Sequence, residues 1–308
     1  MKALALLLVW VAVAGCAGSA YVARPRPGAI LAEGVTHGEG GFEGEKGVKL
    51  FEQWWTPAGE PRAVLVIVHG LKDHSTRYAA FADRLAQHGY EVRAFDLRGH
   101  GSSEGARAYV SDFDEYAQDL DRFVARVRRS GKPLFVLGHS MGGAIATDWV
   151  LTRKPALDGL VLSGAALQAD VSGFTAGLTR LLGAVLPALA VFSLDLDRFS
   201  RDPAVVAQCK ADPLIDRGNG PARTAAQLLR GIDFIRGRFE EVTVPLLALH
   251  GGADVITPPG GSRELVRRAA SADKTLKIYD GLAHDLLHEP ERQQVMADIA
   301  AWMDARIR

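Results

Sequence analysis

The sequence is poor in cysteine, since its 308 residues include only Cys16 and Cys209. Two cysteines cannot make the disulfide framework that stabilises small secreted scaffolds, so the fold must depend on a hydrophobic core. The chain is long enough to bury one, and 48% of its residues are hydrophobic. We interpret Cys209 as a buried or isolated thiol rather than as a nucleophile.

The sequence also lacks an excess of charge of either sign. Its 36 lysines and arginines balance 36 aspartates and glutamates, so the formal net charge is zero. Binding to nucleic acid depends on a positive electrostatic field around the protein. The composition is therefore that of a globular protein, and it excludes nucleic acid as an expected partner.

The N-terminal apolar run is too short to span a membrane. Residues 3–14 follow Lys2 and carry no charge, whereas a spanning helix needs about 20 apolar residues. The run has the length of the apolar region of a signal peptide, and it ends in the sequence VAGC at positions 13–16, which resembles the lipobox of bacterial lipoproteins. We therefore expect residues 1–15 to be a lipoprotein-type signal peptide, Cys16 to be lipidated, and residues 16–34 to be a tether.

This leader predicts an exported protein that is anchored as a lipoprotein on the periplasmic side of the bacterial cell envelope. Two alternatives stay open. Cleavage near Ala17 or Ala20 would release a secreted protein, and an uncleaved leader would form an N-terminal helix.

A serine between glycines organises the rest of the chain. Residues 134–137 form a short apolar run, and the sequence GHSMGG follows at positions 138–143. Ile145 and Trp149 then recur at helical spacing. The pattern predicts a buried strand, a sharp turn that carries Ser140, and a helix, which is how α/β enzymes expose a nucleophilic serine. The alternative is an ordinary glycine-rich turn.

Strand-like and helix-like segments alternate along most of the chain. Apolar runs predict buried strands at 63–68, 91–95, 134–137, 160–163, 245–249 and 275–279. Partial alternation at 47–55 indicates antiparallel strands at the sheet edge. Together they predict an α/β fold, a mostly parallel sheet with helices on both faces. The core would comprise residues 35–165 and 243–308, with a helical cap inserted at 166–242.

The predicted cap contains an unusually apolar stretch. From Val171 to Leu194 the only charged residue is Arg180, and apolar residues recur at helical spacing. Gly183 and Pro187 interrupt the stretch, which argues against a membrane span. Two interpretations stay open: a buried helix, or a lid whose apolar face lines an acyl pocket or touches a membrane.

Three residues suited to hydrolysis follow the ends of separate strands, in the order Ser140, Asp254 and His284. This is the chain order expected of an α/β-hydrolase triad. A serine hydroxyl needs a nearby base, and an imidazole with an unperturbed pKa of about 6.5 suits that role. We predict that His284 takes the serine proton and that Asp254 fixes its tautomer and stabilises the imidazolium.

Other side chains compete for these roles. Asp280 and Asp285 lie closer in sequence to the predicted base, but a close neighbour rarely faces the required side of the ring. His288 is a rival base, and its place near the start of a helix makes it weaker. His139 and His250 are better interpreted as packing or hydrogen-bonding residues.

Hydrolysis of an acyl ester passes through a tetrahedral intermediate with a negatively charged oxygen. Two preorganised hydrogen-bond donors are needed to stabilise this oxyanion. The candidates are the backbone N–H groups of Leu71, which follows the strand that ends in His69-Gly70, and of Met141, which follows the serine. No metal or cofactor is needed for this chemistry, and none is expected.

Further motifs resemble the monoacylglycerol lipase and lysophospholipase branch of the α/β-hydrolases, of the serine aminopeptidase type. They are HG at 69–70, HS at 74–75, RY at 77–78, DLRGHGS at 96–102, GHSMGG at 138–143, DP at 202–203, DPL at 212–214, HGGAD at 250–254 and His284. The resemblance extends from about residue 47 to the C-terminus. It implies hydrolysis of a single-chain acyl ester through a serine acyl-enzyme and a mobile apolar cap. The sequence LKD at 71–73 departs from the family pattern, so selectivity for the alcohol side stays open.

We therefore expect a serine hydrolase that cleaves monoacylglycerol or lysophospholipid, with the membrane surface as a further partner. An aminopeptidase or acyltransferase of the same fold is the alternative. An aminopeptidase would need acidic groups in the cap to hold a substrate amine, and Asp170, Asp195 and Asp197 are candidates. A surface lipoprotein that only binds lipid is a third hypothesis, and the complete set of serine, aspartate and histidine argues against it.

Overall fold

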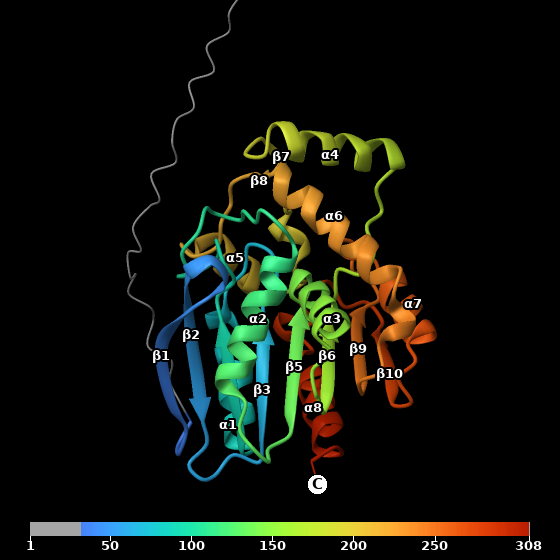
Figure 1. The fold of residues 1–308 in the computed structure, drawn as a ribbon. Helices are drawn as coiled ribbons and strands as arrows, with labels where there is room; N and C mark the ends of the chain where they lie inside the picture. Colours follow the sequence, from blue (N-terminus) through green and yellow to red (C-terminus); the bar gives the residue numbers. More distant parts are fainter. Residues whose placement is uncertain (1–31, 308) are drawn as a thin grey trace, which may run out of the picture.

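The computed structural model describes residues 32–307. The predicted signal peptide, Cys16 and most of the predicted tether lie outside these residues. The described chain is built around an eight-stranded sheet with the strand order β1-β2-β4-β3-β5-β6-β9-β10 (Figure 1). Its strands are β1 (Thr36–Glu43), β2 (Lys49–Thr56), β3 (Ala63–Val68), β4 (Tyr90–Phe95), β5 (Leu134–His139), β6 (Gly159–Ser163), β9 (Leu246–Gly251) and β10 (Lys274–Tyr279).

The sheet is parallel except at one edge. Strand β2 pairs antiparallel with both β1 and β4, and the other neighbouring strands run parallel. The predicted antiparallel edge and parallel centre are therefore confirmed. All six residues of β3 and of β5 are buried, as expected for strands covered on both faces.

Helices cover the two faces of the sheet. Alternate residues of β3 belong to different cores: Val64 and Val66 pack on one face, and Leu65 and Ile67 on the other. The first core contains apolar residues of α2 (Asp114–Val127), α3 (Met141–Arg153) and α7 (Gly260–Arg268), and the second those of α1 (Ala79–Gln87) and α8 (Arg292–Asp304). Short 3-10 helices lie at η1 (Glu45–Gly47), η2 (Ser75–Tyr78), η3 (Leu196–Arg198), η4 (Phe239–Glu241) and η5 (Leu286–His288). The α/β prediction with helices on both faces is confirmed.

A mostly helical insertion separates β6 from β9 and lies beyond the carboxyl ends of the parallel strands (Figure 1). It contains α4 (Gly173–Val185), β7 (Ala190–Phe192), α5 (Pro203–Ala211), β8 (Gly220–Pro221) and α6 (Ala222–Arg236). Helix α4 packs closely on α6, because a Cβ atom on Gly183 would lie only 2.7 Å from Cβ of Ala226. We call the segment from α4 to α6 the cap.

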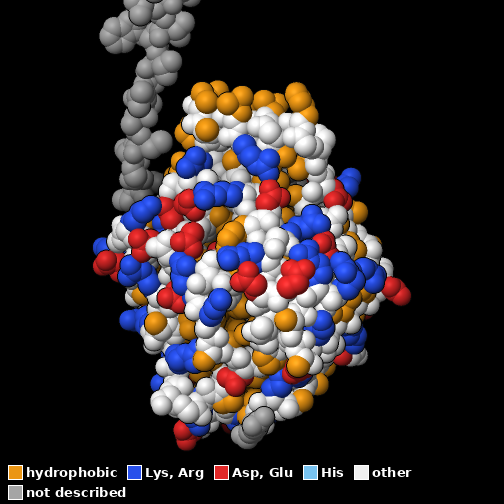
Figure 2. Space-filling model, turned by 45° about the vertical axis from the view of Figure 1, so that its right-hand side comes forward, with side chains coloured by type: hydrophobic (Ala, Val, Ile, Leu, Met, Phe, Trp, Pro, Cys, Tyr) orange, Lys and Arg blue, Asp and Glu red, His pale blue; other side chains and the backbone are white. Residues whose placement is uncertain are grey.

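The outer side of α4 is apolar and exposed to solvent (Figure 2). Phe174, Leu181 and Val185 are 83%, 59% and 66% exposed. Of the two interpretations of this stretch, the buried helix is wrong, because helical periodicity shows that apolar residues share a face but not what that face meets. None of the helices within residues 32–307 is long and apolar enough to cross a membrane.

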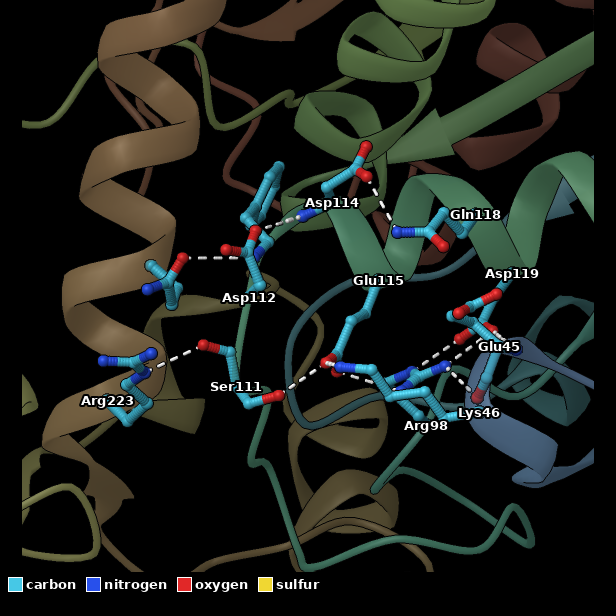
Figure 3. Close-up of polar contacts among 12 residues, drawn as sticks. Glu45, Lys46, Arg98, Ser111, Asp112, Asp114, Glu115, Gln118, Asp119 and Arg223 are labelled. Carbon is cyan, nitrogen blue, oxygen red and sulfur yellow. Dashed lines mark hydrogen bonds and ion pairs between the residues drawn. The ribbon is translucent and has the colours of Figure 1, made fainter.

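A buried polar network joins the core to the cap (Figure 3). The guanidinium of Arg98 donates to Glu115 at 2.9 Å and to Asp119 at 2.6 Å, which fixes the loop after β4 on α2. One turn before α2, the backbone carbonyl of Ser111 accepts a hydrogen bond from Nε of Arg223 on α6, at 2.8 Å. Helix α2 and the segment just before it therefore contact both the loop after β4 and the inner helix of the cap.

Candidate active site

Ser140 lies on a strained turn between β5 and α3. Its backbone has φ 53° and ψ −122°, a left-handed conformation that is costly for a residue with a Cβ atom. The flanking glycines make this turn possible, because a Cβ on Gly142 would lie 2.1 Å from the carbonyl oxygen of Val68, and a Cβ on Gly138 would lie 2.5 Å from that of Gly142. The turn is further fixed by a 3.0 Å hydrogen bond from Ser140 N–H to the carbonyl of Ser163. The predicted strand, turn and helix are present.

His284 and Asp254 lie in contact near this turn. Nδ1 of His284 is 2.8 Å from Oδ2 of Asp254, and both side chains are buried. The backbone N–H groups of Ile256 and Thr257 donate to Oδ1 of the carboxylate at 2.8 and 2.9 Å. Because Nδ1 faces the carboxylate, Nε2 of His284 is the ring nitrogen left for another partner.

The surroundings of Asp254 favour the ionised carboxylate. Burial by itself raises the pKa of this carboxyl group, but hydrogen bonds from His250 and His284 outweigh burial and hold the pKa well below its usual range. His250 is in turn fixed by Ser262, whose hydroxyl lies 2.8 Å from its Nδ1. The expected hydrogen-bonding role of His250 is thus seen in its contacts with the carboxylate.

His139 packs against the imidazole of His284 without adding a charge. The ring centroids are 4.8 Å apart. Burial lowers the pKa of His139 to about 4, so its ring is neutral near pH 7. Its Nδ1 lies 3.0 Å from the carbonyl of Ser163, which places the ring in the packing and hydrogen-bonding role expected from the sequence.

Ser140 and His284 line a cavity of about 550 Å³ between the sheet and the cap. Leu71 and Met141 also line it, so the two residues that carry the predicted oxyanion donors meet at the serine. The N–H of Met141 is the first of α3 and has no acceptor within the helix. Gly70 lets the Leu71 loop approach, because a Cβ there would lie 3.1 Å from Cβ of Ser140.

The cavity wall is mostly apolar, and much of it comes from the cap. The apolar cap residues on the wall are Val191, Phe192, Leu194, Phe199, Ala225, Leu228, Leu229 and Ile232, and Val171 lies just before the cap. The acidic side chains on the wall are Asp73 and Asp170. No lysine or arginine is among the described residues that line it.

The competing side chains are engaged elsewhere. Both ring nitrogens of His288 have partners, since Nδ1 lies 2.7 Å from Asp285 and Nε2 lies 2.9 Å from the carbonyl of Arg77. Asp285 also accepts a hydrogen bond from the Arg77 guanidinium at 2.6 Å. Of the acidic residues considered for an amine site, Asp170 lines the cavity, whereas Asp195 pairs with Arg198 and Asp197 with Lys210.

A buried ion cluster that sequence reasoning did not predict lies behind the site. Arg77 donates to Asp73 at 3.0 Å and to Asp285 at 2.6 Å, although these carboxylates are far apart in the chain. Burial raises the pKa of each carboxyl group. The Arg77 guanidinium outweighs burial at Asp73, and His288 and Arg77 do so at Asp285, so both pKa values lie below the usual range. Within residues 32–307 no three His, Cys, Asp or Glu side chains are grouped as metal ligands would be.

The fold and the arrangement of the serine, histidine and aspartate define an α/β-hydrolase. The family model described as serine aminopeptidase, S33, matches residues 59–291. The chain belongs to this family, which confirms the hydrolase resemblance inferred from the motifs.

Within this family, the chain is similar to several proteins that are named as monoacylglycerol or monoglyceride lipases. The chain is 39% identical over 272 residues to a monoacylglycerol lipase of Mycolicibacterium smegmatis, covering 87% of this chain and 97% of the relative. It is 36% identical over 267 residues to human monoglyceride lipase, covering 84% and 88% of the two chains. Among solved structures, Paleococcus ferrophilus monoacylglycerol lipase aligns with a TM-score of 0.76 at 30% identity, covering 83% of this chain and 99% of that one.

Proposed function

We propose that this protein is a serine carboxylic ester hydrolase that cleaves single-chain acyl lipids, with monoacylglycerol as the preferred class. The observation that carries the proposal is the placement of Ser140 on a strained turn, within a mostly apolar cavity that His284 also lines. Relatives that are named for this activity support it.

The contacts suggest a role for each group. Ser140 Oγ attacks the ester carbonyl while Nε2 of His284 takes its proton, and Asp254 on Nδ1 stabilises the imidazolium. The N–H groups of Leu71 and Met141 bind the oxyanion, and one such donor is typically worth ~3 kcal/mol. The imidazolium then protonates the departing alcohol, leaving an acyl-enzyme. Water, deprotonated by the same imidazole, releases the fatty acid and restores the serine.

The charges on the cavity wall favour an uncharged head group. A lysophospholipid would bring a phosphate next to the exposed carboxylate of Asp170, and no lysine or arginine is among the lining residues that could pair with it. A glycerol head group needs only hydrogen bonds, which this carboxylate can accept. The same carboxylate could hold a substrate amine, so an aminopeptidase is the second candidate.

A substrate panel tests the assignment. Monooleoylglycerol, a lysophosphatidylcholine and an aminoacyl anilide are compared with the wild type, with Ser140→Ala, and with Ser193→Ala as a control that changes another cavity serine. We expect fastest hydrolysis of the monoacylglycerol, a loss of about 10⁴-fold or more in kcat for Ser140→Ala, and little change for Ser193→Ala. Undiminished hydrolysis by Ser140→Ala would refute the mechanism, and preference for the anilide would select the peptidase.

The proposal includes a membrane location. The lipobox-like leader at Cys16 supports export and anchoring on the periplasmic side of a bacterial envelope, with secretion as the alternative. The exposed apolar face of α4 supports a second contact, in which the cap dips into the lipid surface. Labelling cells with a fatty-acid probe tests the anchor, because Cys16→Ser must lose the label.

A further inference from the structure

Thr257 touches both members of the His284–Asp254 pair. Its Oγ1 lies 2.8 Å from Oδ2 of Asp254 and 3.0 Å from Nδ1 of His284. A third neighbour, the carbonyl oxygen of Gly164, is 2.8 Å away. Thr257 is only 6% exposed, so its hydroxyl group interacts mainly with these groups rather than with solvent.

Thr257 also clamps the carboxylate through both of its oxygens. Its backbone N–H donates to Oδ1 of Asp254 at 2.9 Å, while its hydroxyl contacts Oδ2. Two contacts from one residue oppose rotation of the carboxylate about its Cβ–Cγ bond. Since Oδ2 is the oxygen that faces Nδ1 of His284, the clamp also fixes the direction in which the imidazole is held.

The proton of the hydroxyl group can serve only one acceptor at a time. Oδ2 of Asp254 carries negative charge and the carbonyl of Gly164 does not, so the charge-assisted hydrogen bond to Asp254 is the stronger one. A lone pair of Oγ1 then faces the Nδ1–H of His284. The hydroxyl group thus bridges the donor and the acceptor of the hydrogen bond on which the proposed mechanism depends.

We propose that Thr257 is a positioning residue for hydrolysis. It holds the carboxylate of Asp254 and the imidazole of His284 in a fixed relative orientation, so that Nε2 of His284 faces Ser140. The inference rests on the proposed function of these three residues. It adds a fourth side chain, one that acts through the histidine and the aspartate.

The test compares Thr257→Val, which replaces the hydroxyl by a methyl group, with Thr257→Ser, which keeps the hydroxyl. Thr152→Val is the matched control, because Thr152 is a half-buried threonine of α3 that does not line the cavity and whose hydroxyl donates to the backbone carbonyl of Asp148. In Thr257→Val we expect kcat on monooleoylglycerol to fall by about 10- to 100-fold, as for loss of a hydrogen bond to a charged group. KM should stay within about twofold. Thr257→Ser should keep most of the activity, and Thr152→Val should behave as the wild type.

The pH profile separates positioning from simple support of the fold. In Thr257→Val, Oδ2 of Asp254 loses a donor and binds the imidazolium more strongly, while Nδ1–H of His284 loses a neutral acceptor. The change at the charged oxygen is the larger of the two, so the acidic limb of kcat/KM should move to higher pH. His139 and His250, the other titratable side chains in contact with the pair, are unchanged in this variant. Thr257→Ser should leave the limb in place.

Several outcomes would overturn the inference: kcat of Thr257→Val within twofold of the wild type, an acidic limb that stays or moves to lower pH, or an equal loss in Thr257→Ser. Thr257→Ala, measured beside it, provides the same comparison if the valine variant does not fold. Ser140→Ala is assayed in parallel. If that variant is inactive while Thr257→Val is normal, only the positioning role fails; if it is active, the proposed function fails.

Discussion

Replacing Phe174 and Leu181 by serine removes two large side chains from the exposed face of α4 without disturbing the core. They are 83% and 59% exposed, whereas Ala176 and Gly183 on the same helix are buried. Fully burying one such apolar side chain contributes ~1.5–3 kcal/mol. If each is half-buried in a lipid surface, the pair contributes about 1.5–3 kcal/mol, which corresponds to a roughly 10- to 150-fold weaker membrane partition in the double variant.

The assay is sedimentation with phosphatidylcholine vesicles, in a Cys16→Ser background so that the predicted anchor does not contribute to binding. Hydrolysis of a short-chain soluble ester is measured on the same samples, and it should be unchanged because neither residue lines the cavity. Phe234→Ser is the control variant. Phe234 is 38% exposed but lies on α6, under the guanidinium of Arg238, so its loss should leave partition nearly unaltered.

The reasoning is refuted if the double variant and the wild type partition equally, or if Phe234→Ser weakens binding as much as the double variant does. In the first case the face of α4 does not meet lipid. In the second case, any exposed aromatic residue would be enough for membrane binding, and binding would not depend on the position of α4 at the outer end of the cap.

Other variants test the site and its support. Asp254→Asn should lower kcat by about 10⁴-fold in steady-state assays while the fold is kept, because an amide does not stabilise the imidazolium. Gly142→Ala should lower the unfolding free energy in urea by about 3 kcal/mol or more, because its Cβ would overlap the carbonyl of Val68. Asp73 and Asp285 have pKa values in the folded protein that lie below those of the unfolded chain. Their contribution to the free energy of unfolding is therefore complete above about pH 4 and is lost as the pH falls through the pKa values of the folded protein. Arg77→Met should weaken this dependence of the urea midpoint on pH, while the contribution of His288 at Asp285 stays.

The strand and helix pattern could be predicted because it depends on short segments. The run before Ser140 is apolar and short, and the glycines beside it are required by a turn with positive φ, so local sequence is enough. Asp254 and His284 could be selected because each follows a strand, and parallel strands bring their carboxyl ends to one edge of the sheet. Their contact is then a consequence of topology rather than of any local signal.

The contacts that support the site could not be predicted in the same way. Thr257 is an unremarkable threonine in the sequence, and its contact with His284 joins residues 27 positions apart. Arg77 and Asp285 are separated by 208 positions, and no periodic pattern relates them. Helical spacing in α4 likewise revealed a shared apolar face, but its exposure depends on α6 occupying the other side of the helix.

The ion cluster links two parts of the site that the chain keeps apart. Asp73 lies two residues after Leu71, and Asp285 directly follows His284. Arg77 bridges the two carboxylates, so the loop that carries a proposed oxyanion donor is fixed to the loop that carries the proposed base. Removing one partner would leave a buried charge unpaired, which typically costs about 3–5 kcal/mol.

The same loop reaches the cap on its other side. Nζ of Lys72 donates to the carbonyl of Gly218, and Nε2 of His74 lies 2.9 Å from Oδ2 of Asp212, both within the cap. Lys72 is only 3% exposed, and this burial lowers the pKa of its ammonium group. A displacement of the cap segment that contains these acceptors would therefore pull on the residues next to Leu71. Because preorganised donors are effective only when held in place, the contacts of Lys72 and His74 with the cap also support the position of the proposed oxyanion donor at Leu71.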